Sequence, residues 1–337
     1  MTKDTGQKTG QDPPLGYSWG DYIGALVAEA GTLTAVAWKL AERGLGSDDV
    51  ASIERALRRM RARGQRDGGS WGQRLLRTFG VPRGVEDRLR FMGLYHSPFN
   101  DLPLPVCLDQ LRIFDRPPLS ESRARVWLHL GYASVALRRR DFEEAGRCLE
   151  RSTEAAPMPD DARIEHALAR AYLLSRVGSD ADVAAQLAAA ERFLAGASLG
   201  PGEHACFQAR LVDQRAFQRN YRGDHAAALA LYRSLPEADI HPFASYRRDA
   251  GLAYGYSRVG DQEAALVHAR RVCDHAGDGG YTRLRVMALL LLARIEGQPA
   301  AGATIARARA IAERLEDEEL LSRVERAIRP TSRAGAP

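Results

Sequence analysis

The chain of 337 residues has only four cysteines, and they stand far apart without forming a CxxC pair. Closely spaced cysteine pairs are typical of zinc knuckles, and a dense set of cysteines is typical of disulfide-rich secreted domains. The sequence therefore predicts neither kind of fold. We expect the four to be small buried hydrophobic residues in a reducing compartment. They are Cys107, Cys148, Cys206 and Cys273.

Long hydrophobic runs are also missing. The longest, from Val286 to Ala293, is much shorter than the roughly 20 apolar residues that a membrane-spanning helix needs. The segment MTKDTGQKTGQDPP lacks the apolar core of a secretory signal. We therefore expect a cytoplasmic protein with no membrane partner.

Most catalytic and nucleotide-binding motifs are absent. The sequence has no HExxH, no GxGxxG and no GxxxxGK followed by Ser or Thr. A single GxSxG, residues 196–200, does not stand at a strand-to-helix turn, which is where a nucleophilic serine of that motif lies. His96 lies beside aromatic residues and a proline, which favours a structural hydrogen-bonding role. His268, Cys273 and His275 lie around an expected helix end with spacing that does not suit a metal. We expect no enzyme, no cofactor and no metal site.

A short repeated pattern organises the second half of the chain. Residues 140–145 read RDFEEA, residues 223–228 read GDHAAA, and residues 260–265 read GDQEAA. The second and third copies start 37 residues apart, and a weaker turn at Gly178 follows Arg140 by 38. A turn residue, an acid and then a small Ala suit a tight link between two helices that cross closely at the Ala.

From Ser120 onward the apolar spacing predicts paired helices and a final capping helix. The expected pairs are 123–139 with 142–155, 160–177 with 181–195, 203–222 with 225–235, 243–259 with 262–276, and 281–296 with 300–315. Leu320, Leu321, Val324 and Ile328 then form one apolar stripe of a last helix. Such a helix would close the open end of a stack of repeats.

This half, residues 119–330, resembles the tetratricopeptide repeat family. The resemblance implies a right-handed helical solenoid in which the first helix of each pair lines a concave groove for a peptide or protein segment. Recurring Arg near Asn, Ser and aromatic residues suits peptide backbone and carboxylates, although the Lys and Asn set of the family's carboxylate clamp is incomplete. The groove positions implied are Arg138, Tyr172, Arg176, Arg210, Phe217, Asn220, Tyr221, Arg247, Tyr254 and Arg258.

Positive charge is concentrated near the N-terminus. Residues 51–90 hold eleven arginines against four acidic residues, a net charge of +7, whereas the whole chain carries +5. A charge difference of this size between segments favours a polyanionic partner for the basic part. A solvated arginine-rich surface is the other interpretation.

Residues 19–116 are expected to form a separate helical N-terminal domain, ending before Pro117 and Pro118. A helix runs from Asp21 to Gly31, and a second runs to Arg43. A third begins at Ser47, carries Asp48 and Asp49 in its first turn, and buries a stripe that includes Ile53, Leu57 and Met60. Residues 1–18 and 331–337 are expected to be disordered.

The stretch from 20 to 64 resembles a helix-turn-helix unit. The residues that carry the resemblance are LTAVAWKLA at 33–41 and SDDVASIER at 47–55. The resemblance implies a third helix in the DNA major groove, with arginines on phosphates. Asp48 and Asp49 depart from this pattern because acids there would repel phosphates. The candidate DNA-binding residues are Arg55, Arg58, Arg59, Arg63 and Arg66.

The sequence therefore predicts an all-α protein and leaves two functions open. In the first, the chain is similar to bacterial regulators in which a repeat solenoid senses a peptide and a helix-turn-helix head binds duplex DNA. The sequence leaves the oligomeric state open, and a homodimer is compatible with it. In the second, it is a protein–protein adaptor, and the N-terminal helices only extend its interaction surface. The basic segment 51–90 favours the first, and the acids before the third helix favour the second.

Overall fold

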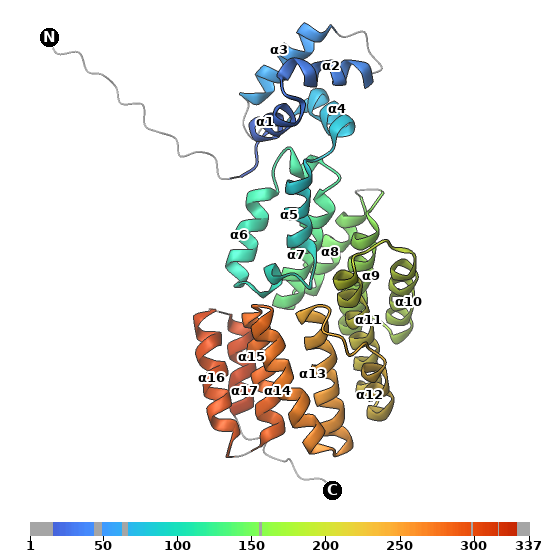
Figure 1. The fold of residues 1–337 in the computed structure, drawn as a ribbon, viewed down its shortest axis with the longest axis vertical. Helices are drawn as coiled ribbons and strands as arrows, with labels where there is room; N and C mark the ends of the chain where they lie inside the picture. Colours follow the sequence, from blue (N-terminus) through green and yellow to red (C-terminus); the bar gives the residue numbers. More distant parts are fainter. Residues whose placement is uncertain are drawn as a thin grey trace, which may run out of the picture. The chain divides into compact units, whose positions relative to one another are not determined.

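The computed structural model describes residues 16–43, 49–62, 67–154, 157–297, 299–315 and 317–328. Over these residues the chain folds entirely into helices and turns, without any strand (Figure 1). The predicted all-α class is confirmed. The helices form two compact units, one of Met1–Leu89 with Gln110–Arg125 and the other of Arg90–Asp109 with Val126–Pro337. We call the first unit the head and the second the paired-helix unit.

The head is built mainly from four short helices. They are α1 (Trp19–Ala30), α2 (Leu33–Arg43), α3 (Val50–Arg61) and α4 (Gly69–Phe79), followed by the short 3-10 helix η2 (Leu119–Glu121). Two further helices, α5 (Arg83–Gly93) and α6 (Leu104–Phe114), are divided between the head and the paired-helix unit.

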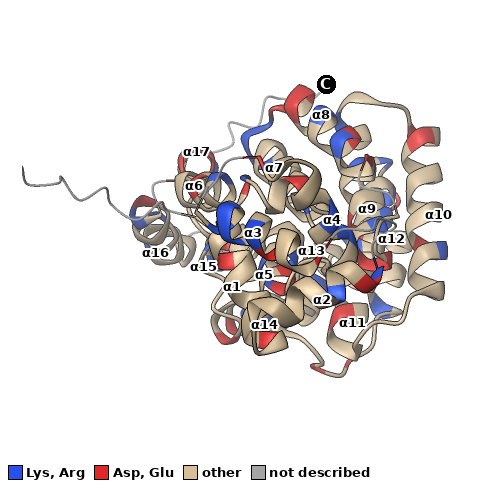
Figure 2. Ribbon diagram, turned by 90° about the horizontal axis from the view of Figure 1, so that it is seen from above, with Lys and Arg blue, Asp and Glu red and all other residues tan. Residues whose placement is uncertain are grey.

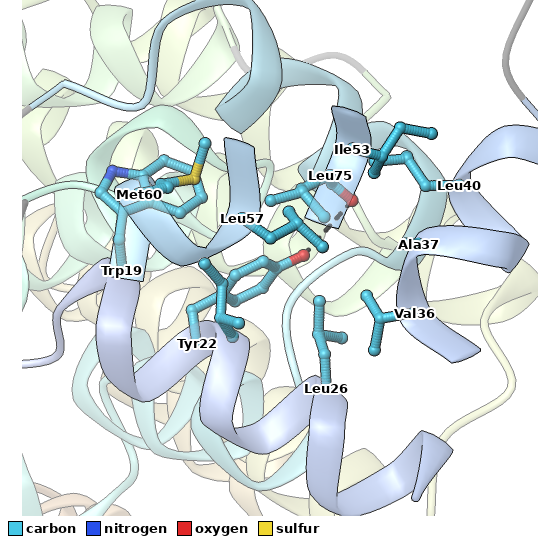
Figure 3. Packing of buried hydrophobic residues seen from close by; sticks show 11 residues of the cluster. Trp19, Tyr22, Leu26, Val36, Ala37, Leu40, Ile53, Leu57, Met60 and Leu75 are labelled. Atoms are coloured by element: carbon cyan, nitrogen blue, oxygen red, sulfur yellow. Dashed lines mark hydrogen bonds between the residues drawn. The ribbon is translucent and has the colours of Figure 1, made fainter. Parts of the chain in front are cut away.

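One apolar core holds α1 to α4 together (Figure 3). The stripe predicted on the third helix points into it, because Ile53, Leu57 and Met60 are buried. Its buried members are Trp19, Tyr22, Ile23, Leu26, Val36, Ala37, Leu40, Ile53, Leu57, Met60 and Leu75. At roughly 25 cal/mol per Å² of apolar area, such a core is the main force that stabilises a small unit.

Two aromatic residues of α1 fix the position of α4. The Tyr22 hydroxyl donates a hydrogen bond of 2.7 Å to the carbonyl oxygen of Gly80. The Trp19 ring lies so close to Gly68 and Gly72 that a Cβ at either position would be under 3 Å from it. These two glycines therefore make room for the indole.

The start of α3 differs from the prediction. The helix begins at Val50, with Asp49 at the N-cap position, and its first turn contains no acidic residue. Asp49 thus precedes the first turn instead of lying in it. Ser47 and Asp48 lie outside the described residues.

Besides residues 90–109, the described part of the paired-helix unit contains five successive helix pairs and a last helix. The pairs are α7 (Arg125–Arg139) with α8 (Phe142–Thr153), α9 (Asp160–Val177) with α10 (Asp180–Gly196), α11 (Pro201–Tyr221) with α12 (His225–Arg233), α13 (Pro242–Val259) with α14 (Gln262–Asp278), and α15 (Thr282–Glu296) with α16 (Ala301–Arg314). The last helix is α17 (Glu318–Ile328). Neighbours such as α13, α14 and α15 lie side by side (Figure 1).

The repeated sequence pattern forms one recurring turn. Its first residue has a left-handed backbone, with φ of 61° at Arg140, 80° at Gly223 and 91° at Gly260. The next residue is an Asp whose carboxylate caps the following helix, accepting a 3.1 Å hydrogen bond from a backbone N–H in each copy. The Ala at the crossing is fully buried in all three copies, as predicted, at positions 145, 228 and 265.

Residues 90–109 pack within the paired-helix unit, although the sequence placed them in the N-terminal domain. The short 3-10 helix η1 (Pro98–Asp101) explains this difference. The Asp101 carboxylate accepts hydrogen bonds from the backbone N–H groups of Arg283 (2.6 Å) and Leu284 (3.0 Å), at the start of α15. The Tyr281 hydroxyl also donates to the carbonyl oxygen of His96. Contacts across more than 180 residues leave no local signal in the sequence.

In the described residues, no single helix has both the length and the apolarity to cross a membrane. One bent pair, α1 with α2 at 91°, meets those two criteria only when its helices are taken together.

Candidate functional site

The paired-helix unit contains a cavity of about 780 Å³ lined by the first helices of the successive pairs. Its walls come mainly from α7, α9, α11, α13, α15 and α17, and Tyr95 adds one side chain. A volume of this size falls in the range of ligand-binding sites. Five of the predicted groove residues line it: Arg138, Tyr172, Arg176, Arg210 and Arg247.

Arginine dominates the charge of this cavity. Eight arginines line it against three acidic residues, Glu165, Asp213 and Glu319. The arginines are Arg138, Arg140, Arg176, Arg210, Arg247, Arg283, Arg323 and Arg326. An excess of guanidinium groups in a concave site attracts anions, because the surrounding protein screens charge less well than water.

The arginines on the inner wall are held by carboxylates from neighbouring elements. Arg210 makes a bidentate ion pair with Glu165, with N–O distances of 2.5 and 2.8 Å, and both side chains are almost fully buried. Arg247 binds Asp213 at 3.0 Å and also donates to the Tyr95 hydroxyl at 3.0 Å. The sequence predicted Arg210 and Arg247 at the groove, but it gave no sign of these partners.

Tyr95 lies among these charges. Burial favours the neutral phenol, but the guanidinium groups of Arg247, Arg283 and Arg210 together lower the pKa of the Tyr95 hydroxyl below its ordinary value. The backbone N–H of Tyr95 donates to Glu165 at 3.1 Å. Tyr95 therefore belongs to the cavity wall, although the sequence analysis did not select it for the groove.

Arg138 links the first and last helices of the unit. Its guanidinium donates to the carbonyl oxygens of Asn100 and Leu102, both at 2.9 Å, and to the Asp317 carboxylate at 3.2 Å. Arg283 approaches the same carboxylate at 3.6 Å. Arg138 is thus buried in a structural network and exposes little of its charge to a ligand.

Three arginines at the cavity have no such acidic partner. Arg140, Arg176 and Arg326 are exposed, and none of them takes part in an ion pair within the described residues. Arg176 instead lies over the rings of Tyr172 and Phe217, at 5.0 and 5.3 Å. These three side chains remain able to pair with an incoming anion.

A second depression of about 710 Å³ adjoins the cavity, and the two share five lining residues. It is lined by Tyr172, Phe217, Tyr221 and Tyr254, which we call the aromatic shelf. Tyr221 is 85% exposed and Phe217 is 44% exposed. The predicted Asn220 lies in the same depression.

Arg258 is the one predicted groove residue that lines neither depression. Its guanidinium contacts the His225 ring, with Nη2 and Nε2 2.9 Å apart. His225 in turn contacts the Asn220 side chain through Nδ1 at 2.9 Å. Arg258 therefore lies outside both depressions and contacts the second one only indirectly, through His225 and Asn220.

In the head, the arginines of α3 point away from the core. Figure 2 shows α3 with the blue of its basic residues. Arg55, Arg58 and Arg59 are exposed and, with Ser52, line a shallow depression. Arg58 makes an exposed ion pair with Glu54 at 2.8 Å. Arg63 and Arg66 lie outside the described residues.

A buried cluster of charged side chains on α13 and α14 was not predicted from the sequence. The Asp249 carboxylate is fully buried and contacts His268 Nδ1 at 2.6 Å and His275 Nε2 at 3.0 Å, while Arg248 donates to it at 3.1 Å. Burial opposes ionisation of Asp249, but these partners lower the pKa of its carboxyl to about 2. The spacing of seven between the two histidines, which places them on one helix face, was the available signal.

Among the described residues, no group of three or more His, Cys, Asp or Glu side chains has an arrangement that could hold a metal ion. The four cysteines are unpaired thiols, and three of them are buried. In comparisons with protein-family models, curated proteins and solved structures, none matches this chain.

Proposed function

We propose that this protein is a non-catalytic regulatory protein of the bacterial cytoplasm. In this proposal the paired-helix unit is a tetratricopeptide-like right-handed solenoid that binds a peptide or protein segment. The observation that carries it is the lining of two adjoining depressions by nine of the ten groove residues that the repeat pattern implied. Extended concave surfaces built from the first helices of repeats are typical of proteins that bind peptides.

We further propose that the head is a helix-turn-helix-like unit that contacts duplex DNA. Support comes from α3, whose apolar side is buried in the head core while Arg55, Arg58 and Arg59 face outward. Arginines on phosphates supply most non-specific DNA affinity. The first turn of α3 contains no acidic residue, although Asp49 stands at its N-cap position.

The DNA proposal is tested by fluorescence-anisotropy titration of the full chain against its own promoter fragment and a random duplex, over a series of salt concentrations. Changing Arg55, Arg58 and Arg59 together to Ala should weaken binding. It should also lower the slope of log K against log[salt] by about 0.9 for each phosphate contact removed.

The matched control changes three exposed arginines of the paired-helix unit, Arg270, Arg271 and Arg307, to Ala. This control alters the net charge by the same amount, so it should change the salt slope much less. Equal losses in the two triple variants would show that general charge, and not α3, governs the binding.

The alternative function is a protein–protein adaptor without nucleic-acid binding. It is favoured by Trp38 on α2, which is 56% exposed, because Trp is enriched in protein interfaces. If the wild-type chain binds neither duplex, the adaptor is the better description. The exposed face of α2 is then the first place to seek a partner.

A further inference from the structure

We propose that the ligand of the cavity is a short acidic peptide, bound with its acidic end among the arginines and its apolar side chains on the aromatic shelf. This inference rests on the proposed peptide-binding function and specifies its ligand. It makes the site selective for carboxylates over neutral peptides.

The charge of the cavity divides into two layers. On the inner wall, Glu165, Asp213 and Asp317 already neutralise Arg210, Arg247 and Arg138. Outside this layer, Arg140, Arg176 and Arg326 have no carboxylate partner in the described part of the chain. Arginine binds carboxylates with two parallel hydrogen bonds, so these three groups can hold two or more acidic groups of a ligand.

Arg140 supplies an independent reason to expect a charged ligand. It occupies the left-handed turn position that is Gly in the two other copies of the turn, at φ of 61°. A side chain at such a position costs about 1 kcal/mol or more. Residues held in unfavourable backbone conformations concentrate at binding sites, where the side chain is needed. The Arg140 side chain lines the cavity.

The adjoining shelf distinguishes a peptide from a small anion. The cavity and the shelf depression share Tyr172, Arg176, Asp213, Gln214 and Met287, so one extended ligand can occupy both. Arg176 lies between them, stacked over the rings of Tyr172 and Phe217. A compact polycarboxylate would fill the arginine-rich part and leave the exposed aromatic rings uncovered.

Isothermal titration calorimetry of the full-length protein tests the inference with two matched probes. The acidic probe is the hexapeptide Phe-Leu-Ser-Glu-Asp-Glu, and the neutral probe is Phe-Leu-Ser-Gln-Asn-Gln, which has nearly the same shape. We expect the acidic probe to bind at least about tenfold more tightly, because each charged hydrogen bond to Arg contributes more than a neutral one. Citrate, a small tricarboxylate, should bind more weakly than the acidic hexapeptide.

Two double variants locate the contact. Arg176→Gln with Arg326→Gln should reduce affinity for the acidic probe about tenfold or more, and affinity for the neutral probe little. The control, Arg270→Gln with Arg271→Gln, removes the same charge from exposed positions of α14 that do not line the cavity, and should leave both affinities unchanged. All four positions are exposed, so neither variant removes core packing.

The outcomes separate this inference from the function on which it rests. Equal binding of the two hexapeptides would overturn the acidic preference while supporting a peptide site. Citrate binding as tightly as the acidic peptide would instead show a small-anion site. If neither peptide binds to the wild-type chain, the inference and the proposed peptide binding fail together. Equal loss of acidic-probe affinity in both double variants would also overturn the assignment of the site to the cavity.

Discussion

At the turn before α8, a residue that we propose to bind the ligand has a strained backbone conformation. Arg140 has the same left-handed backbone as Gly223 and Gly260, but it carries a side chain that strains this conformation. The backbone hydrogen bonds at the turn are nevertheless the same. The N–H of the following Asp donates to a carbonyl oxygen five residues back, at 2.9 Å in the first copy and 3.0 Å in the third.

Replacing Arg140 with Gly should therefore stabilise the protein. We expect the free energy of unfolding to rise by roughly 1 kcal/mol, because Gly adopts a positive φ without the steric penalty. Urea denaturation followed by circular dichroism measures this change. The same variant should bind the acidic hexapeptide more weakly, since the cavity loses a guanidinium.

Arg139→Gly is the control, because Arg139 is the last residue of α7 and is also exposed. Glycine inside a helix lowers stability by up to about 1 kcal/mol, so the control should be neutral or destabilising. If the two variants shift stability in the same direction, backbone strain at Arg140 is not the cause.

At the level of helices, the sequence predicted local features well. The expected bounds of the five pairs match α7 to α16 to within about two residues at nearly every end, because turn glycines, capping acids and apolar periodicity are local signals. Ala145, Ala228 and Ala265, which the sequence predicted as small residues between paired helices, are all fully buried.

What the sequence could not predict are partners that are distant along the chain. Arg210 and Arg138 were both predicted at the groove, but Glu165 on α9 and Asp317 just before α17 neutralise them. Neither pairing follows from spacing, since the partners are separated by 45 and 179 residues. The sequence thus allowed the groove positions to be predicted. It did not distinguish the arginines without a carboxylate partner from the arginines that a buried carboxylate neutralises.

The contact between α13 and α14 should make stability depend on pH. The hydrogen bond that the His275 ring donates to the Asp249 carboxylate raises the pKa of His275 above its ordinary value of 6.5. A raised histidine pKa contributes stability that is fully present below about 6.5 and is lost as the pH rises through the folded-state value. We therefore expect urea denaturation to require less urea at pH 8.5 than at pH 6.

His275→Gln should make this pH difference smaller, because Gln does not gain a proton. His204 is exposed on α11, so His204→Gln serves as the control and should leave the difference unchanged. A difference that survives intact in the His275 variant would assign the pH effect to another group.

At the scale of the whole paired-helix unit, one buried carboxylate connects its first helix pair with its last helix. Asp317, just before α17, accepts from Arg138 of α7 and lies 3.6 Å from Arg283 of α15. It also caps α17 by accepting from the backbone N–H of Leu320 at 3.1 Å. Since α17 places Arg323 and Arg326 at the cavity, this joint completes the wall of the site.

Asp317→Asn keeps an oxygen for the helix cap but removes the charge that neutralises Arg138. Breaking a buried ion pair from one side costs about 3 to 5 kcal/mol, because the remaining charge stays buried without a partner. We expect a loss of this order in urea denaturation, together with weaker binding of the acidic hexapeptide.

Asp224→Asn is the matched control, because Asp224 caps α12 in the same way. Its ion pair with Arg219 is exposed and 3.8 Å long, so the loss of stability should stay below about 1 kcal/mol. Similar losses in the two variants would show that capping, and not the joint between α7 and α17, accounts for the role of Asp317.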